Sequence, residues 1–347
     1  MNFLITGNMS YVGSVLELYL KSEYPGSKVF GFDAGYFASC VLDKELLPES
    51  RIDCQYFGDV RNFPDEILNN VNTVIHLAAI SNDPMGKEFE DVTGKINFEG
   101  TINLAKKAKE HGVKNFVFAS SCSVYGFAGD FPKTENDSVN PLTAYAKSKI
   151  DSENSLRLLA DDTFTITCLR FATACGYSPR LRLDLVLNDF VASAISSGKI
   201  SILSDGSPWR PLIDVSDMAR AINWAANRNA EHSGFFLIVN TGSNEGNYNV
   251  RQLAEAVVAM LPGTEITINP NAVLDRRSYK VDFTLFETLA IGFLPQKSLR
   301  SSITEIIDGL IINKFSDTNF RNSKLIRLNI LKQLQSDKVI DDNLWYI

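Results

Sequence analysis

The feature that most constrains the fold is the alternation of short apolar runs with helix-like segments in the first half of the chain. Residues 12–22 and 90–111 carry the three-to-four-residue spacing of amphipathic helices, and they lie between strand-like runs. Strands that alternate with helices form a parallel sheet with helices on both faces. The sequence therefore predicts an α/β fold with a doubly wound parallel sheet, whose first strands are expected at residues 3–5, 29–32, 73–77 and 115–119.

The second half of the chain is less regular. We expect a strand at 165–169 and helices near 184–197, 216–228, 249–261 and 325–334. This change of pattern predicts one large domain at residues 1–170, with return segments near 210–245. A smaller lobe with a helical tail is expected at residues 171–347.

Composition excludes several classes of protein. The formal net charge is −7 and the basic residues are scattered, so binding to nucleic acid is not expected. The five cysteines form no Cys-x-x-Cys pair and only three histidines are present, which predicts a reducing compartment and no metal site. The sequence shows neither the pattern of a signal peptide nor an apolar run long enough to span a membrane, so we expect a cytoplasmic protein with no membrane partner.

The loop between the first strand and the first helix has the form of a phosphate-binding turn. Gly7 permits a tight turn, Gly13 permits close approach of the helix to the sheet, and Ser10 stands where a middle glycine is common. The N–H groups of a helix N-terminus suit a pyrophosphate. Asp33 ends the second strand, where a carboxylate can bind the ribose of a dinucleotide and would repel a 2′-phosphate. These residues predict binding of NAD in preference to NADP.

Residues 34–58 follow this carboxylate and have no clear period. We interpret them as an insertion near the mouth of the cofactor site or as a dimer contact.

A Tyr-x-x-x-Lys motif provides the candidate chemistry. Tyr145 and Lys149 share a helix face, so the ammonium group of Lys149 can lower the pKa of the phenol and favour a general base. The motif follows a strand that ends in serines, and ligands of a doubly wound sheet bind at the carboxyl ends of its strands. A second match, Tyr24 with Lys28, contains Pro and Gly and is interpreted as a chance occurrence.

Taken in order, these segments resemble the extended short-chain dehydrogenase/reductase superfamily. Within it, the chain is most similar to the NAD-dependent epimerase/dehydratase family that includes UDP-glucose 4-epimerase, over about residues 1–300. The matching pieces are the Thr-Gly start of the loop ending at Gly13, Asp33, Gly58-Asp59-Val60, His76-Leu77-Ala78-Ala79, Asn97, the Ser-Ser-x-x-Val-Tyr-Gly segment at 120–126, and Tyr145 with Lys149.

The resemblance implies a Rossmann domain, a smaller C-terminal substrate-binding lobe and a homodimer. It implies that Ser121, Tyr145 and Lys149 are catalytic, with Ser121 bound to the hydroxyl at sugar C4. It implies a cofactor site made of Gly7, Ser10, Tyr11, Val12, Gly13, Asp33, Asp59, Val60, Leu77, Ala78, Ala79, Asn97, Tyr145 and Lys149. It also implies that a nucleotide sugar is bound by Ser121, Ser123, Thr173, Asn188, Arg210 and Arg277, with Arg276 as the alternative to Arg277.

Three features depart from the family pattern. Ser10 replaces a glycine, which could weaken the fit to the pyrophosphate, and Thr173 replaces a substrate-contacting asparagine. The tail beyond about residue 315 is longer than usual. The identity of the sugar is therefore left open.

The leading hypothesis is a nucleotide-sugar epimerase that acts at C4 through a transient 4-keto intermediate. One alternative is a dehydrogenase or 4-ketoreductase that uses the same residues for a single hydride transfer. A second alternative is a non-catalytic NAD-binding regulatory module. Dehydration is not expected, because family dehydratases carry an Asp-Glu pair where this chain has Cys122 and Ser123. Relatives that epimerise C3 and C5 carry a cysteine in place of Ser123, which disfavours that reaction too.

Overall fold

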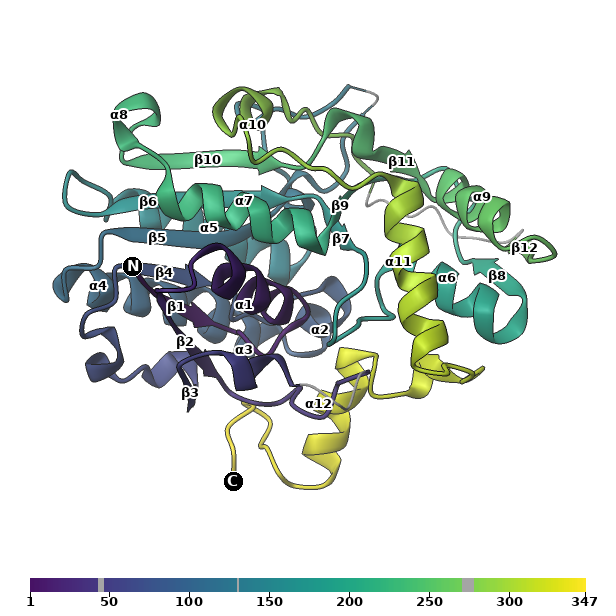
Figure 1. Ribbon diagram of the computed structural model, residues 1–347, viewed down its shortest axis with the longest axis horizontal. Coiled ribbons are helices and arrows are strands. Elements are labelled where there is room, and N and C mark those ends of the chain that lie inside the picture. The colour runs from purple at the N-terminus through teal and green to yellow at the C-terminus, as the bar shows by residue number, and fades with distance from the viewer. Residues whose placement is uncertain (43–46, 130, 270–277) are drawn as a thin grey trace.

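The computed structural model describes residues 1–42, 47–129, 131–269 and 278–347, and it is built around one large sheet (Figure 1). All neighbouring strands of this sheet are parallel, in the order β10-β6-β5-β4-β1-β2-β3. The chain adds strands in one direction from β1 and then in the other from β4, so the order reverses between these two neighbours. Their carboxyl ends form the crevice in which sheets of this kind bind ligands. The strands are β1 (Asn2–Thr6), β2 (Lys28–Asp33), β3 (Cys54–Phe57), β4 (Thr73–His76), β5 (Asn115–Ser121), β6 (Thr165–Phe171) and β10 (Phe236–Thr241).

Helices cover both faces of the sheet, which confirms the predicted doubly wound fold. Alternate side chains of a strand point to opposite faces, so Phe3 and Ile5 join one buried cluster whereas Leu4 joins another. The first cluster packs under α1 (Tyr11–Glu23) and α7 (Val215–Asn227). The second packs under a continuous helical run and α5 (Ala144–Arg157); the run consists of α3 (Glu90–Gly94), the π-helical turn η4 (Lys95–Gly100) and α4 (Thr101–Glu110).

A smaller lobe with its own buried cluster extends beyond the carboxyl ends of the strands (Figure 1). It contains a three-stranded sheet of β7 (Thr173–Cys175), β9 (Trp209–Asp214) and β11 (Asn247–Asn249), and a pair formed by β8 (Lys199–Ile202) and β12 (Glu265–Ile268). Its main helices are α6 (Val186–Ser197), α9 (Val250–Met260) and α11 (Leu299–Ile312). The shorter elements are α2 (Asp83–Glu88), α8 (Ala230–Ser233), α10 (Thr284–Leu289), η1 (Pro48–Arg51), η2 (Val60–Asn62), η3 (Asp65–Leu68), η5 (Cys122–Tyr125), η6 (Asn244–Gly246) and η7 (Phe320–Asn322).

The segment interpreted as an insertion ends in a strand of the main sheet. This strand, β3, pairs with β2 at the edge of the sheet, and the sequence analysis did not predict it. Its four residues are half exposed on both faces, so they show no alternation of apolar and polar residues. Near its start, the same segment places Tyr36 and Phe37 at the wall of the large cavity described below. The described part of this segment is therefore both a sheet strand and a cavity wall.

The C-terminal tail packs back on the main sheet. The predicted helix exists as α12 (Arg327–Ser336), and the chain then runs to an end near β3 (Figure 1). Leu331 and Leu344 are fully buried in the same cluster as Leu4. Arg61 donates hydrogen bonds to the carbonyl groups of Asn343 and Leu344, and its guanidinium lies 3.6 Å from the centre of the Trp345 ring. The last residues therefore belong, by packing, to the sheet rather than to the smaller lobe.

Candidate active site

A cavity of about 700 Å³ lies at the carboxyl ends of the central strands. Its walls include residues that follow β1, β2, β4 and β5, and others from the lobe and the tail. Most of the residues predicted from the sequence line it: Gly7, Ser10, Tyr11, Val12, Asp33, Asp59, Val60, Leu77, Ala78, Ala79, Ser121, Ser123, Tyr145, Lys149, Thr173 and Arg210.

The glycine loop requires glycine at two positions. Gly7 has a φ of 74°, and a Cβ atom there would lie 2.6 Å from the amide nitrogen of Ala78. A Cβ atom at Gly13 would lie 2.2 Å from the carbonyl oxygen of Asn8, so only glycine lets α1 approach the loop. Ser10 needs no such freedom, because its φ is −99° and its hydroxyl caps α1 by accepting a hydrogen bond from the Gly13 N–H. The departure from the family glycine is therefore accommodated by helix capping.

Asp33 fixes the loop as well as facing the cavity. Its carboxylate accepts hydrogen bonds from the amide of Met9, at 3.0 Å, and from the amide of Gly35, at 2.7 Å. Burial raises the pKa of Asp33 above its usual value, and these two amide donors act in the opposite direction. Asp59, the second carboxylate at this end of the cavity, is held in a two-point ion pair by Arg61, with the shorter contact at 2.6 Å.

The predicted catalytic set comes from the end of β5 and the first turns of α5. The Thr143 hydroxyl caps α5 by accepting a hydrogen bond from the Ala146 amide, which fixes where the helix begins. Tyr145 and Lys149 then follow one turn apart on the face toward β5. The Lys149 ammonium donates to the carbonyl oxygen of Ala119 at 2.7 Å and lies 5.6 Å from the centre of the Tyr145 ring. The structure thus brings Ser121, Tyr145 and Lys149 to one wall.

Burial dominates the ionisation of both helix residues. It raises the pKa of Tyr145 to about 12, while interaction with the Ser121 hydroxyl lowers it. Burial also lowers the pKa of Lys149 to about 8, with the Glu153 carboxylate opposing that shift. The sequence predicted a lowered phenol pKa from the motif; the shift has the opposite sign here because desolvation of the phenolate outweighs the favourable contacts.

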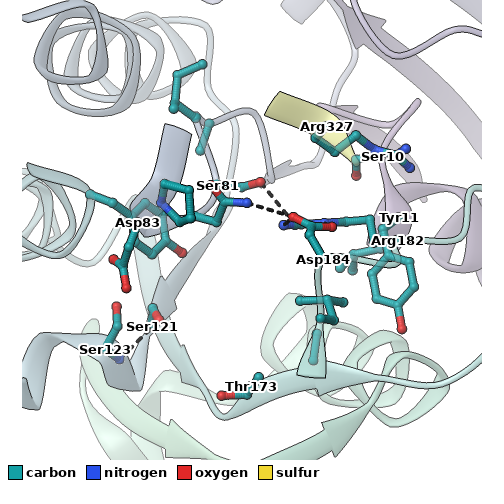
Figure 2. Close-up of a pocket in the computed structure, with 18 of the residues that line it drawn as sticks. Ser10, Tyr11, Ser81, Asp83, Ser121, Ser123, Thr173, Arg182, Asp184 and Arg327 are labelled. Atoms are coloured by element: carbon teal, nitrogen blue, oxygen red, sulfur yellow. Dashed lines mark hydrogen bonds and ion pairs between the residues drawn. The ribbon is translucent and has the colours of Figure 1, made fainter. Parts of the chain in front are cut away.

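Cys122 points away from the cavity. Its thiol is fully buried and donates to the carbonyl oxygen of Arg170 at 3.0 Å. Burial raises the pKa of this thiol well above its usual value, and the thiol does not line the cavity, so neither its charge nor its position favours a role as a base. Ser123, the next residue, lines the cavity beside Ser121 (Figure 2). Tyr24 of the second Tyr-x-x-x-Lys match does not line the cavity; its hydroxyl donates to Asn223, which fits the chance occurrence.

Two predicted binding residues act from behind the walls. Asn97 is 1% exposed and its amide bonds to the N–H and the carbonyl of Ile80, so it holds the segment after β4. Asn188 is fully buried, accepts from the amide of Gly176 and donates to the carbonyl of Arg182. Neither side chain lines the cavity, because the hydrogen bonds of each are made to the backbone of a loop that lines it. Arg276 and Arg277 lie outside the described residues.

Several cavity residues were not predicted. Arg182 and Asp184, in the loop between β7 and α6, form a two-point ion pair with contacts of 2.6 and 3.0 Å, and Arg182 also donates to the Ser81 hydroxyl (Figure 2). Asp83 lines the cavity and accepts a hydrogen bond from Thr143. Arg327, from α12, lines it too. The only local signal was the alternation of charged and leucine residues at 180–185; nothing near residue 327 marks it.

The fold and these walls define a dinucleotide-binding enzyme of the α/β type. A sequence model of the "NAD dependent epimerase/dehydratase family" matches residues 3–242. The chain belongs to this family. That membership confirms the predicted NAD cofactor and the predicted class, an extended short-chain dehydrogenase/reductase that acts on nucleotide sugars.

Individual relatives span several activities. The chain is 26% identical over 321 residues to the UDP-glucose 4-epimerase of Mycolicibacterium smegmatis, covering 89% of this chain and 98% of that one. It is 28% identical over 263 residues to UDP-glucuronic acid decarboxylase 2 of Arabidopsis thaliana, covering 73% and 57%. Among solved structures, MoeE5 in complex with UDP-glucuronic acid and NAD is similar with a TM-score of 0.76 and 24% identity, covering 90% and 99%. The UDP-glucose 4-epimerase of Thermotoga maritima has a TM-score of 0.76 and 22% identity, covering 90% and 100%.

The residues present fit NAD. The close approach of Gly7 and Gly13 to neighbouring backbone leaves the N-terminus of α1 open for a pyrophosphate, and Asp33 stands at the position of a ribose acceptor. In the part of the chain that the structure describes, no helix is long and apolar enough to cross a membrane.

Proposed function

We propose that this enzyme is a nucleotide-sugar epimerase that inverts carbon C4 through a transient 4-keto sugar, with a uridine diphosphate hexose as substrate. The observation that carries the proposal is the make-up of the catalytic wall: Ser121, Tyr145 and Lys149 converge there, whereas Cys122 is turned into the core. With Cys122 outside the cavity, we assign proton transfer at the sugar hydroxyl to Tyr145. The uridine nucleotide is inferred from the names of the relatives, which include UDP-glucose 4-epimerases.

Each residue of the wall has one task in this reaction. The Ser121 hydroxyl positions the sugar hydroxyl at C4, and Tyr145 removes its proton and later returns it. The Lys149 ammonium stays close to the phenol ring and binds the Ala119 carbonyl, which keeps it from swinging away. NAD, when bound, supplies the hydride acceptor and a positively charged ring. Positive charge beside a phenol favours the phenolate, so we infer that Tyr145 gives up its proton in the loaded enzyme.

The experiment is turnover of UDP-glucose and UDP-galactose in heavy water. The proposal predicts interconversion with no net change in NADH and no deuterium on carbon, since the hydrogen at C4 returns to the same carbon. Deuterium at C5 or C6 would overturn it in favour of dehydration or 3,5-epimerisation. Stoichiometric reduction of added NAD to NADH would instead support the dehydrogenase alternative, and stoichiometric oxidation of added NADH with a 4-keto sugar would support the 4-ketoreductase alternative. NAD binding with no turnover across a broad panel of sugar nucleotides would favour the regulatory module.

A homodimer is part of the proposal, on the strength of the family resemblance alone. Light scattering of the purified protein tests it, and a monomer at micromolar concentration would remove it.

A further inference from the structure

Three buried arginines, Arg180, Arg182 and Arg327, interact with one another at the cavity, which Arg182 and Arg327 line and behind which Arg180 lies. Two of the three form ion pairs with carboxylates. Arg180 is fully buried and pairs with Glu49 at 2.7 Å, while also donating to the carbonyl groups of Phe37 and Ala38. Arg182 pairs with Asp184 at 2.6 Å. A buried charge is costly unless it is paired, and both of these satisfy that requirement.

Arg327 is different. It is 2% exposed, and its guanidinium donates to the carbonyl oxygens of Arg180, at 2.7 Å, and Leu181, at 3.3 Å. Among the described residues no carboxylate lies within ion-pair distance of it, and burial lowers its pKa. These neutral carbonyl groups do not offset its positive charge, and Asp184, which is already paired with Arg182, acts on Arg327 only from beyond ion-pair distance. A buried guanidinium without a carboxylate of its own is suited to bind an anion.

The position of Arg327 indicates which anion this is. Arg327 lines the cavity together with Ser10 and Tyr11, the residues at the N-terminus of α1, and Figure 2 shows it on their side of the cavity. Its guanidinium lies 5.5 Å from the centre of the Phe37 ring, which follows shortly after the ribose acceptor Asp33. Tyr145 and Lys149, which mark the reacting end, belong to a different wall. Between an adenosine end at Asp33 and a reacting end at Tyr145, a dinucleotide has its diphosphate.

We propose that Arg327 is a cofactor-binding residue that contacts the diphosphate of NAD, so that the C-terminal segment completes the cofactor site. A guanidinium fork matches phosphate oxygens, and it acts here together with the N–H groups at the start of α1. Arg180 serves as the support, because its backbone carbonyl holds Arg327 while its own side chain fixes the backbone at Phe37. The inference rests on NAD use and not on the proposed reaction at C4.

The test compares ligands with and without a diphosphate. NAD, ADP, adenosine and UDP are titrated by calorimetry into the full-length chain after bound nucleotide has been removed. Arg327→Gln keeps N–H donors and removes the charge, and we expect it to weaken NAD and ADP by about 10- to 100-fold, the range for one charge-assisted phosphate contact. Adenosine and UDP should bind as they do to the unaltered protein. The matched control is Lys332→Met, which removes an exposed positive charge from the same helix and should change none of the four affinities.

Each other outcome contradicts the proposal. Unchanged binding of ADP by Arg327→Gln would show that Arg327 does not contact the diphosphate of the cofactor. Equal weakening of ADP and adenosine would show that Arg327 only shapes the wall around Phe37. Weakening of UDP alone would assign Arg327 to the diphosphate of the sugar nucleotide. If Arg327→Gln does not fold, Arg327→Lys decides: it keeps the charge, so ADP must still bind more tightly than adenosine, and loss of that preference would overturn the inference. Because the readout is binding, a failure to epimerise sugars would leave this test intact.

Discussion

Two sets of residues line the cavity, and they differ in how the chain assembles them. The early set is Gly7, Asp33, Ser121, Tyr145 and Lys149. Each member lies at or just after a strand end of the main sheet or in the first two turns of α5. The late set is Thr173, Arg182, Asp184, Arg210 and Arg327, which come from a loop, two strands of the lobe and the tail helix. We assign proton transfer to the early set, and we assign cofactor binding to Gly7 and Asp33 of this set together with Arg327 of the late set. Most of the late set carries charge, so the charged wall of the cavity is built from segments far apart in sequence.

The largest effect is expected in the early set. Tyr145→Phe should lower kcat by about 10²- to 10⁴-fold, the usual contribution of a positioned acid–base group, and should leave NAD binding intact. Steady-state rates with UDP-glucose and a separate NAD titration measure the two effects. Tyr24→Phe is the control, because its hydroxyl bonds to Asn223 away from the cavity. Turnover near the unaltered rate in Tyr145→Phe would exclude this residue as the base.

The next effect belongs to the late set. Arg210 lines the cavity from β9, and Arg210→Ala should weaken binding of the sugar nucleotide by about 10- to 100-fold, as for loss of one charge-assisted bond to phosphate. NAD affinity should change much less, because the residues that we assign to the cofactor are Gly7, Asp33 and Arg327 and do not include Arg210. Competition binding with UDP measures the difference. The control is Arg251→Ala, because Arg251 is exposed and its amide donates to the carbonyl of Gly206, just before β9; neither affinity should change. A parallel loss of NAD and UDP affinity would erase the distinction between the two sets.

A smaller effect concerns the choice of cofactor. Asp33 should make NAD bind at least about tenfold more tightly than NADP, a difference of roughly 1.4 kcal/mol, because its carboxylate would face the 2′-phosphate. Titration of both cofactors checks this. Asp33→Ser, which can still accept one of the two backbone hydrogen bonds, should narrow the gap. Equal or tighter binding of NADP by the unaltered protein would show that Asp33 does not read the ribose.

The last effect is on stability and not on ligand binding, and it tests a residue behind the late set. Asn188→Ala should lower the free energy of unfolding by about 1–3 kcal/mol, because the amide of Gly176 and the carbonyl of Arg182 lose their buried partner. Chemical denaturation measures it. Ser196→Ala, on the same helix, is the control, since its hydroxyl has no hydrogen-bond partner among the described residues and its loss should cost little. A loss of sugar-nucleotide affinity without a loss of stability would instead support the expected role of Asn188 in binding the nucleotide sugar.

The early set could be predicted because its signals are local. Gly7 and Gly13 are separated by one turn and the start of a helix, and Tyr145 and Lys149 by one helical turn, so sequence spacing fixes their geometry. The direction of the pKa shift of Tyr145 could not be predicted from nearby residues, because it depends on burial by the surrounding walls. β3 was missed for a related reason, because an edge strand is defined by its neighbour β2 and not by its own pattern.

The sequence by itself determined the α/β class and the NAD cofactor, and it predicted the phosphate loop and the residues of the proposed catalytic wall. These features depend on residues a few positions apart or on strand ends that a parallel sheet must bring together. Only the tertiary structure decided that Arg182 pairs with Asp184 inside the cavity, that Asn97 and Asn188 stand behind its walls, and that α12 brings Arg327 to the cofactor side. The physical reason is that a contact between distant residues depends on how whole elements pack. Whether a carboxylate compensates the charge of a buried arginine depends on the side chains packed around it, and no short stretch of sequence contains all of them.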